Sequence, residues 1–348
     1  MRSAALLVFV GSALCGCGGR TGLLFDLIPP SADGSATTAG TGGGSGTVGS
    51  STSSTTPCST ASLPWLLFEL DDGEATRLYA MRSDGSSGHR VPLVHDSQLY
   101  ASISADGTKL TYVVFEPESD GGYDGTLYLE DLTTRTAAAL LSSGEPPLYS
   151  SISGDDETIA YTQGQGIYVM GADGQSSRLV IEAPPSSTFG DGHPLFVGST
   201  NTILYGAYHA FASIETDGSN DVTLVTEGSI AAGFFPNPAL SPDLASVAAA
   251  VQCEEDEEAW VRVYPYASLP ASCESGAKIA KTSGYSSAPN EAADPSWGPT
   301  NLIAYADAKD VFVVSAAGGA PRNMTAALTS RRGSAFDPIW ADGCAPVP

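Results

Sequence analysis

Basic residues are scarce in this chain. Its 348 residues include 15 Lys and Arg against 39 Asp and Glu, which gives a formal net charge of −24 at pH 7. Nucleic acids and anionic lipid surfaces are bound through a positively charged footprint, so the bulk of this surface suits neither of them. We therefore expect neutral, cationic or locally basic partners, and no nucleic acid.

Long helical segments are also missing. Charged residues make up only 16% of the chain, whereas Gly and Pro number 39 and 23. No extended segment combines a helical period with helix caps. The composition is typical of short strands joined by turns, which favours an all-β protein.

The apolar run near the start, Ala4 to Val10, is too short to span a bilayer. It follows a short basic start and precedes Leu14-Cys15-Gly16-Cys17, as expected for an export signal. A Leu three residues before a Cys, with a small residue directly before that Cys, resembles the bacterial lipobox. The resemblance implies a signal peptide over residues 1–16, a lipid on Cys17 and an outer-membrane location. The alternative is an ordinary signal peptide with incidental cysteines.

Residues 17–62 are predicted to form a tether. Ser31 to Ser59 is almost entirely Ser, Thr, Gly and Ala, which cannot bury a core and behaves as flexible coil. The globular part is therefore expected to comprise residues 63–348.

One sequence unit recurs throughout this globular part. Second strands such as KLTYVV and third strands such as TLYLED recur, often followed by Asp-Gly or Gly-Gly turns. Six inner-strand signatures, 43 to 57 residues apart, begin at Tyr100, Tyr149, His193, Asn237, Asp294 and Asp337. The residue three positions further on is always large and apolar: Ile103, Ile152, Phe196, Leu240, Trp297 and Trp340.

A period in the forties with four strands per unit indicates a β-propeller. The first unit, which begins at Pro64, lacks its first strand, while the last signature, at Asp337, has no further strands after it. The C-terminal strand is therefore predicted to complete the first blade. The fold class is all-β, a six-bladed β-propeller whose closure removes exposed sheet edges.

One repeat, Pro238 to Asp243 with the sequence PALSPD, has degenerate copies in ASISADG, SSISGDD and PSWGPT. This pattern resembles the PD40 repeat of TolB-like propellers over roughly Pro64 to Gly343. The resemblance implies the propeller fold. TolB-like proteins carry an extra N-terminal domain where this chain has its tether, so their role in the Tol–Pal system is not carried over.

Four cysteines remain once Cys15 and Cys17 are assigned to the signal and the lipid. An exported protein is expected to form disulfides. Cys58 and Cys344 flank the propeller, so a bond between them would fasten the ring, whereas Cys253 and Cys273 surround an insertion in the longest unit. Four cysteines allow three pairings, and all three stay open.

The six positions at the inner-strand starts are the main candidate binding site. The residue types at these six positions vary, whereas the position three residues later is always large and apolar. This is expected if packing fixes the apolar position and a ligand contacts the variable one. We expect them around the mouth of the central channel, where carboxylates, His, Asn and phenols would suit a cationic or polyhydroxyl group, or the basic end of a peptide. In the alternative, Asp and Asn bind backbone amides and the Tyr rings fill the channel.

No catalytic, metal or cofactor site is expected. The chain lacks a G-x-S-x-G elbow on an α/β scaffold and leaves no room for a catalytic domain after the propeller. The acidic run Glu254 to Glu258 is interpreted as a solvated hairpin tip, and Glu116 to Asp124 lacks the oxygen spacing of a calcium loop. Zinc-site spacing is missing among the four histidines, which are His89, His95, His193 and His209.

The sequence thus predicts a monomeric, lipid-anchored envelope protein, facing the periplasm or the medium, that binds a protein or a cell-envelope glycan without catalysis. One alternative is a glycosidase or lyase, in which Asp294 and Asp337 would form a carboxylate pair. Another is an envelope scaffold without a small ligand.

Overall fold

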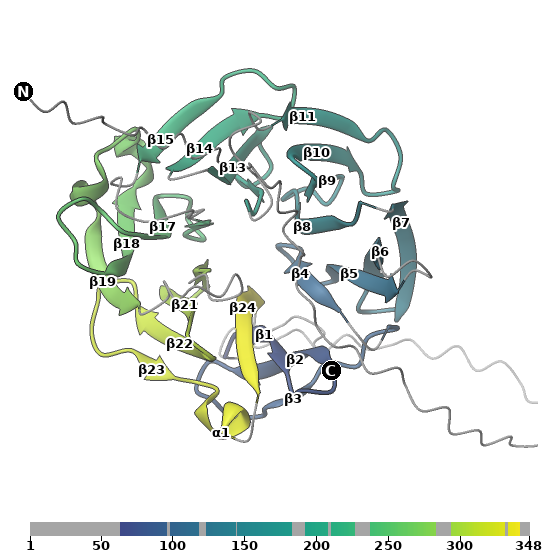
Figure 1. Ribbon diagram of the computed structural model, residues 1–348, viewed down its shortest axis with the longest axis horizontal. Coiled ribbons are helices and arrows are strands. Elements are labelled where there is room, and N and C mark those ends of the chain that lie inside the picture. The colour runs from purple at the N-terminus through teal and green to yellow at the C-terminus, as the bar shows by residue number, and fades with distance from the viewer. Residues whose placement is uncertain are drawn as a thin grey trace, which may run out of the picture. The chain divides into compact units, whose positions relative to one another are not determined.

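The computed structural model describes residues 63–95, 98–117, 123–143, 145–182, 192–207, 210–226, 237–282, 294–330 and 333–341. In these ranges, six four-stranded antiparallel sheets surround a common axis (Figure 1). The protein is a six-bladed β-propeller, as predicted. The predicted signal peptide and tether, Cys17, Cys58, Cys344 and His209 lie outside the described residues.

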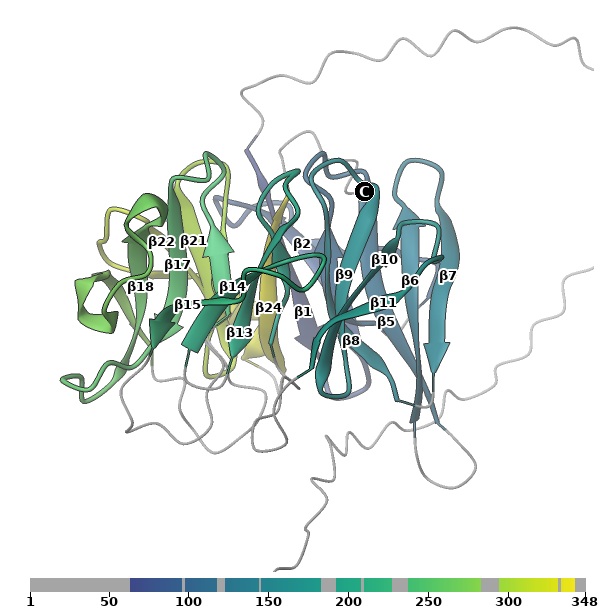
Figure 2. The same cartoon turned by 90° about the horizontal axis from the view of Figure 1, so that it is seen from above.

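Each blade is a simple meander, and the blades stand side by side around the axis (Figure 2). The first contains β1 (Trp65–Asp71), β2 (Thr76–Arg82), β3 (His89–Arg90) and the C-terminal β24 (Ser334–Ala341). The second contains β4 (Leu99–Ile103), β5 (Lys109–Pro117), β6 (Tyr123–Asp131) and β7 (Thr136–Ser143). The third contains β8 (Pro147–Ile152), β9 (Thr158–Gln163), β10 (Gly166–Gly171) and β11 (Arg178–Glu182).

The other three blades follow the same order. The fourth contains β12 (Leu195–Phe196), β13 (Thr202–Ala207), β14 (Ala210–Glu215) and β15 (Val222–Thr226). The fifth contains β16 (Pro238–Leu240), β17 (Ser246–Val251), β18 (Ala259–Pro265) and β19 (Ala277–Thr282). The sixth contains β20 (Ser296–Trp297), β21 (Leu302–Asp307), β22 (Asp310–Ser315) and β23 (Arg322–Asn323). Within the described ranges, no helix is long and apolar enough to cross a bilayer; α1 (Ala326–Thr329) is a single turn.

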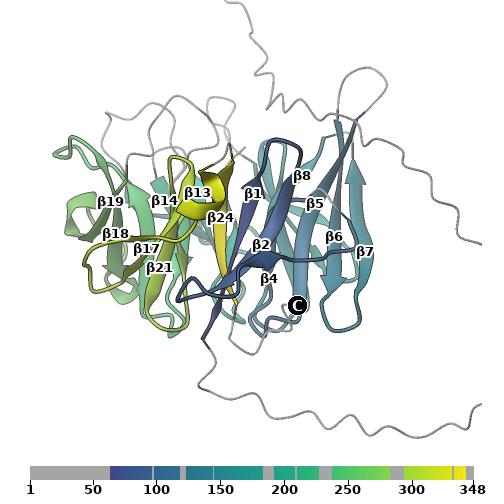
Figure 3. The same ribbon diagram turned by 90° about the horizontal axis from the view of Figure 1, so that it is seen from below.

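The ring closes through the two ends of the propeller. Strand β24 pairs antiparallel with β1, from Trp65 opposite Ala341 to Asp71 opposite Ser334 (Figure 3). The innermost strand of the first blade therefore comes from the C-terminal end, as the incomplete first unit predicted. This pairing covers the edge of β1, which would otherwise be open to another chain.

The repeated Ser-x-Asp sequence builds the turn between the first and second strands of a blade. The Ser104 hydroxyl donates to Asp106 Oδ1 (2.7 Å) and accepts the backbone N–H of Lys109 (3.0 Å). The same two bonds recur at Ser153 with Asp155 and at Ser241 with Asp243. The PD40-like pattern is thus explained by turn geometry, in which short side chains satisfy local backbone groups.

Aromatic pairs hold the second and third strands of several blades together. Their rings stack with centroids 5.5 to 6.2 Å apart in the pairs Phe68–Tyr79, Tyr112–Tyr128, Tyr161–Tyr168 and Tyr305–Phe312. The hydrophobic cores lie between blades. In one of them, Leu66 and Phe68 of the first blade pack with Ala304 and Val311 of the sixth. Each sheet therefore buries both faces against its neighbours, which fixes the position of every inner strand around the axis.

The long fifth unit contains a disulfide between Cys253 and Cys273, which are both buried. These residues lie 20 positions apart. Replacing both by Ala is expected to lower the free energy of unfolding by about 3 kcal/mol, because the unfolded chain loses a closed loop of this size. Urea unfolding of both proteins, with and without dithiothreitol, would measure the difference. A change below about 0.5 kcal/mol, or an equal effect of the reductant on both proteins, would contradict this expectation.

Candidate functional site

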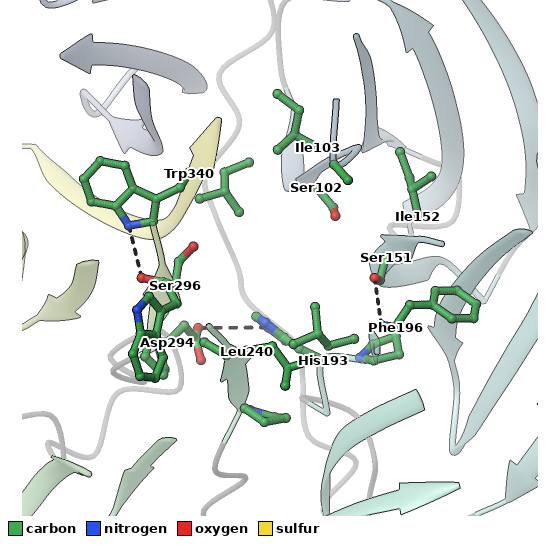
Figure 4. A pocket seen from close by; sticks show the side chains of 18 of the residues that line it. Ser102, Ile103, Ser151, Ile152, His193, Phe196, Leu240, Asp294, Ser296 and Trp340 are labelled. Atoms are coloured by element: carbon green, nitrogen blue, oxygen red, sulfur yellow. Dashed lines mark hydrogen bonds and ion pairs between the residues drawn. The ribbon is translucent and has the colours of Figure 1, made fainter. Parts of the chain in front are cut away.

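The inner strands enclose a cavity of about 600 Å³ on the axis of the ring (Figure 4). A polar layer of its lining comes from the starts of the inner strands and contains Tyr100, Tyr149, His193, Asp294 and Asp337. An apolar layer lies three residues further along each strand and contains Ile103, Ile152, Phe196, Leu240, Trp297 and Trp340. Three residues of a strand extend about 10 Å, so the two layers form different ends of the cavity.

Five of the six predicted site residues thus line one cavity. The sixth, Asn237, is 5% exposed and lies beside it. Its side-chain oxygen accepts the backbone N–H of His193 (3.1 Å), and its amide nitrogen donates to Asp294 Oδ1 (2.5 Å). Asn237 therefore connects the fourth, fifth and sixth blades and positions two of the residues that face the cavity.

Strand bulges set the backbone at three of these positions. Tyr100, Tyr149 and Asp337 each lie where the inner strand carries one residue more than its partner strand. Tyr100 and Asp337 have φ angles of 60° and 46°, in the left-handed region that costs a non-glycine residue about 1 kcal/mol or more. A bulge re-aims the side chain of its extra residue. Here the bulged residues contribute to the cavity wall.

One side of the polar layer is aromatic. The ring of Tyr149 lies 4.4 Å from that of Tyr100 and 3.5 Å from that of His193, measured between centroids. The three rings, from three consecutive blades, form a row along the wall. All three rings line the cavity.

The opposite side of the polar layer is acidic. Asp294 and Asp337 each offer a carboxylate oxygen here, and these oxygens lie within 4.8 Å of each other. Burial raises the pKa of both groups to about 7; the charge of Asp337 adds to the effect at Asp294, and the charge of Glu69 adds to it at Asp337. None of the residues lining the cavity in the described ranges is Lys or Arg. The acidic wall therefore has no fixed positive charge to balance it there.

Glu69 adds a third buried acid that the sequence analysis missed. It lies on β1 opposite Phe336, next to the bulge at Asp337, and is 1% exposed. Burial raises its pKa to about 8, although its carboxylate accepts the backbone N–H of Ala101 (3.0 Å). Its other oxygen has no hydrogen-bond partner. A single carboxylate within the apolar strand PWLLFEL was the signal available in the sequence.

His193 connects the aromatic and acidic sides. Its Nε2 lies 4.0 Å from Asp294 Oδ2 and is buried without a hydrogen-bond partner. Burial lowers the pKa of the imidazole, while the charge of Asp294 opposes that effect. His193, Asp294 and Asp337 each offer a ligand atom, and these atoms all lie within 4.8 Å of one another. Motif spacing did not predict this cluster, because its members come from three different blades.

The acidic run in the fifth blade is exposed at Glu254, Glu255, Glu257 and Glu258, as predicted for a solvated tip, and Asp256 is the exception. Asp256 is buried, with its Oδ2 2.7 Å from the Arg262 guanidinium and its Oδ1 2.5 Å from Lys278 Nζ. Both cations come from neighbouring strands of the same blade. Asp256 is therefore part of a buried ion-pair network within an otherwise exposed run.

No protein-family model and no curated protein matches this sequence. Among solved structures, TolB from Acinetobacter baumannii is similar with a TM-score of 0.63 and 18% identity, over 80% of this chain and 66% of that one. The chain therefore has a TolB-like propeller fold, and it spans just under two thirds of the length of that TolB. At this level of identity the similarity concerns the fold alone.

Two further solved structures are more distant. A TolB candidate from Agrobacterium tumefaciens has a TM-score of 0.43 and 13% identity, over 63% of this chain and 90% of that one. An oligogalacturonate lyase in complex with manganese has a TM-score of 0.45 and 13% identity, over 76% and 72% of the two chains. These similarities are too low to support a functional argument.

Proposed function

We propose that this propeller is a non-catalytic binding module that holds a peptide segment of a partner protein in its central cavity. The observation that carries the proposal is the apolar layer of the cavity, where two Trp side chains stand among aliphatic residues and Phe196. Trp340 Nε1 donates to the Ser296 carbonyl (3.1 Å) and Trp297 Nε1 to Asn301 Oδ1 (3.2 Å). Rings held in this way are suited to anchor an apolar side chain, and Trp is enriched among residues that dominate protein–protein binding.

The carboxyl geometry supports binding over glycoside hydrolysis. In that chemistry two carboxyl groups lie about 5–5.5 Å apart in retaining enzymes and about 6.5–9.5 Å apart in inverting enzymes. The nearest ligand oxygens of Asp294 and Asp337 lie within 4.8 Å of each other, below both of these ranges. The acidic wall also disfavours an acidic partner, so a neutral or basic segment fits best.

The proposal includes a location in the bacterial cell envelope. It rests on the lipobox-like Leu14 to Cys17 and on the tether that follows. Lipidation of Cys17 would hold the propeller near a membrane while leaving the cavity accessible. Mass spectrometry of the protein purified from membranes tests this part, because replacement of Cys17 by Ser should abolish the lipid-modified N-terminal peptide.

The binding proposal predicts that Trp297→Ala weakens peptide binding at least tenfold, since it removes an aromatic anchor from the cavity. Peptides would be selected from a phage-displayed random library on the immobilised protein, and their affinities measured by isothermal titration calorimetry. The matched control is Trp260→Ala on β18, whose ring packs near Lys278 and does not line the cavity. Its affinity should stay within twofold of the wild type.

Two results would contradict the binding proposal. One is an equal loss of affinity in the two Trp variants, since the peptides would then bind elsewhere. The other is turnover of envelope oligosaccharides by the wild-type protein that disappears in Asp294→Asn or Asp337→Asn, because the cavity would then be catalytic.

A further inference from the structure

The polar layer of the cavity contains more negative groups than its surroundings balance. Asp294 and Asp337 offer carboxylate oxygens within 4.8 Å of each other, and the buried Glu69 has one unpartnered carboxylate oxygen. No Lys or Arg among the described lining residues faces this group. Uncompensated buried charge is costly, and proteins usually pair such groups or use them to coordinate metals.

We propose that the polar layer is a binding site for one divalent transition-metal ion, with His193 Nε2 and one carboxylate oxygen each from Asp294 and Asp337 as its ligands. The site goes beyond the proposed peptide binding, which uses the other end of the cavity. Three inner-strand starts supply the ligands, so the ion would connect the fourth, sixth and first blades.

The imidazole of His193 is the strongest indication of a metal. Its Nε2 is buried and makes no hydrogen bond, although leaving such an atom unsatisfied costs about 1–3 kcal/mol. The ring is held by the face of Tyr149, 3.5 Å away, so it cannot turn towards solvent without losing this contact. Nε2 already lies 4.0 Å from Asp294 Oδ2. A metal ion between these two atoms would satisfy both.

The surroundings of the carboxylates also fit a metal site. Asn237 donates to Asp294 and, through its oxygen, fixes the backbone of His193. Outer groups that orient metal ligands in this way are a regular feature of metal centres. Asp294 and Asp337 would coordinate the ion in their deprotonated form, as metal ligands do.

The donor set indicates which ion fits. Imidazole together with carboxylates suits Zn²⁺ and Mn²⁺, whereas Ca²⁺ takes oxygen ligands alone. In a tetrahedral zinc site with ligand atoms about 2.1 Å from the ion, these atoms lie about 3.4 Å apart. The three ligand atoms lie within 4.8 Å of one another, so the side chains need to close by up to about 1.4 Å on binding. We therefore expect Zn²⁺ or Mn²⁺ to bind and Ca²⁺ to bind much more weakly.

Calorimetric titration of the purified chain tests the site. After EDTA treatment and dialysis, ZnCl₂, MnCl₂ and CaCl₂ would be titrated separately at pH 7.5. One Zn²⁺ or Mn²⁺ per chain is expected, and His193→Phe and Asp294→Asn should each weaken it at least tenfold. Phe preserves the ring contact with Tyr149, and the thermal unfolding midpoint of each variant in EDTA checks that it is folded.

The control is the double variant Glu254→Gln and Glu255→Gln, which removes two exposed carboxylates of the acidic run. Its metal affinity should equal that of the wild type. The metal site is wrong if the wild type binds no ion stoichiometrically, or if the control loses as much affinity as His193→Phe. Trp297→Ala should retain the ion, so loss of peptide binding and loss of metal binding can be told apart.

Discussion

Replacing Asp256 by Ala is expected to lower the free energy of unfolding by about 3–5 kcal/mol, because it leaves a buried guanidinium without its counter-charge. The side chains of Asp256 and Arg262 are both 3% exposed. Arg262 also donates to the carbonyls of Glu274 and Gly276, at 3.2 and 2.8 Å, so it cannot leave the interior easily. Urea unfolding at pH 7, followed by tryptophan fluorescence, would measure the change.

The same blade offers a matched control. Glu258 pairs with Lys281, but these side chains are 47% and 52% exposed. Exposed ion pairs contribute about 0–1 kcal/mol, so Glu258→Ala should have a small effect. Replacing Asp256 by Leu and Arg262 by Met together should recover much of the loss, since no buried unpaired charge then remains and Lys278 is 44% exposed. Equal losses in Asp256→Ala and Glu258→Ala would contradict a buried ion pair.

Stability is expected to decrease as the pH rises from about 5 to 8 when metal is removed with EDTA. The pKa of Glu69 is raised to about 8, and those of Asp294 and Asp337 to about 7. Between the usual carboxyl pKa and these values the folded protein binds more protons than the unfolded chain. The stability that these groups contribute is therefore fully present below their pKa in the unfolded chain. It decreases as the pH rises further, until the pH exceeds their pKa in the folded protein. For Glu69 alone the loss is roughly 3–5 kcal/mol.

Glu69→Gln isolates this contribution. The amide oxygen can still accept the Ala101 N–H but carries no charge, so the variant should be more stable than the wild type at pH 8.5 and should show a flatter pH profile. Glu74→Gln, an exposed change beyond the same strand, should leave the profile unaltered. Chemical unfolding at several pH values would measure both. A wild-type stability that is constant or rises between pH 5 and 8 would contradict burial of these acids.

The fold could be predicted because its signals are local and repeated. An apolar residue three after each inner-strand start marks every blade, Ser-x-Asp turns mark three of them, and the incomplete first unit predicted the pairing of β24 with β1. The alignment of strand starts also brought together five residues that line the cavity. Repeats place equivalent residues around one axis, so their proximity follows from the architecture alone.

Contacts between blades and between neighbouring strands could not be predicted in this way. The metal-type cluster depends on how His193, Asp294 and Asp337 converge across three blades, and no spacing motif encodes it. Asp256 was predicted to be solvated with the rest of its acidic run. It is buried because Arg262 and Lys278, on two neighbouring strands, pair with it, and the sequence of the run does not reveal these partners. Glu69 was missed because the residues it contacts lie far away in the sequence: it pairs opposite Phe336 of β24 and accepts the Ala101 N–H.

A crystal structure of the protein with a selected peptide tests whether the cavity on the propeller axis is the binding site. We expect an apolar side chain of the peptide to contact Trp297 and Trp340, with the peptide entering along the axis. A peptide bound on the outer strands of the blades, with only solvent in the cavity, would show that the binding site lies elsewhere.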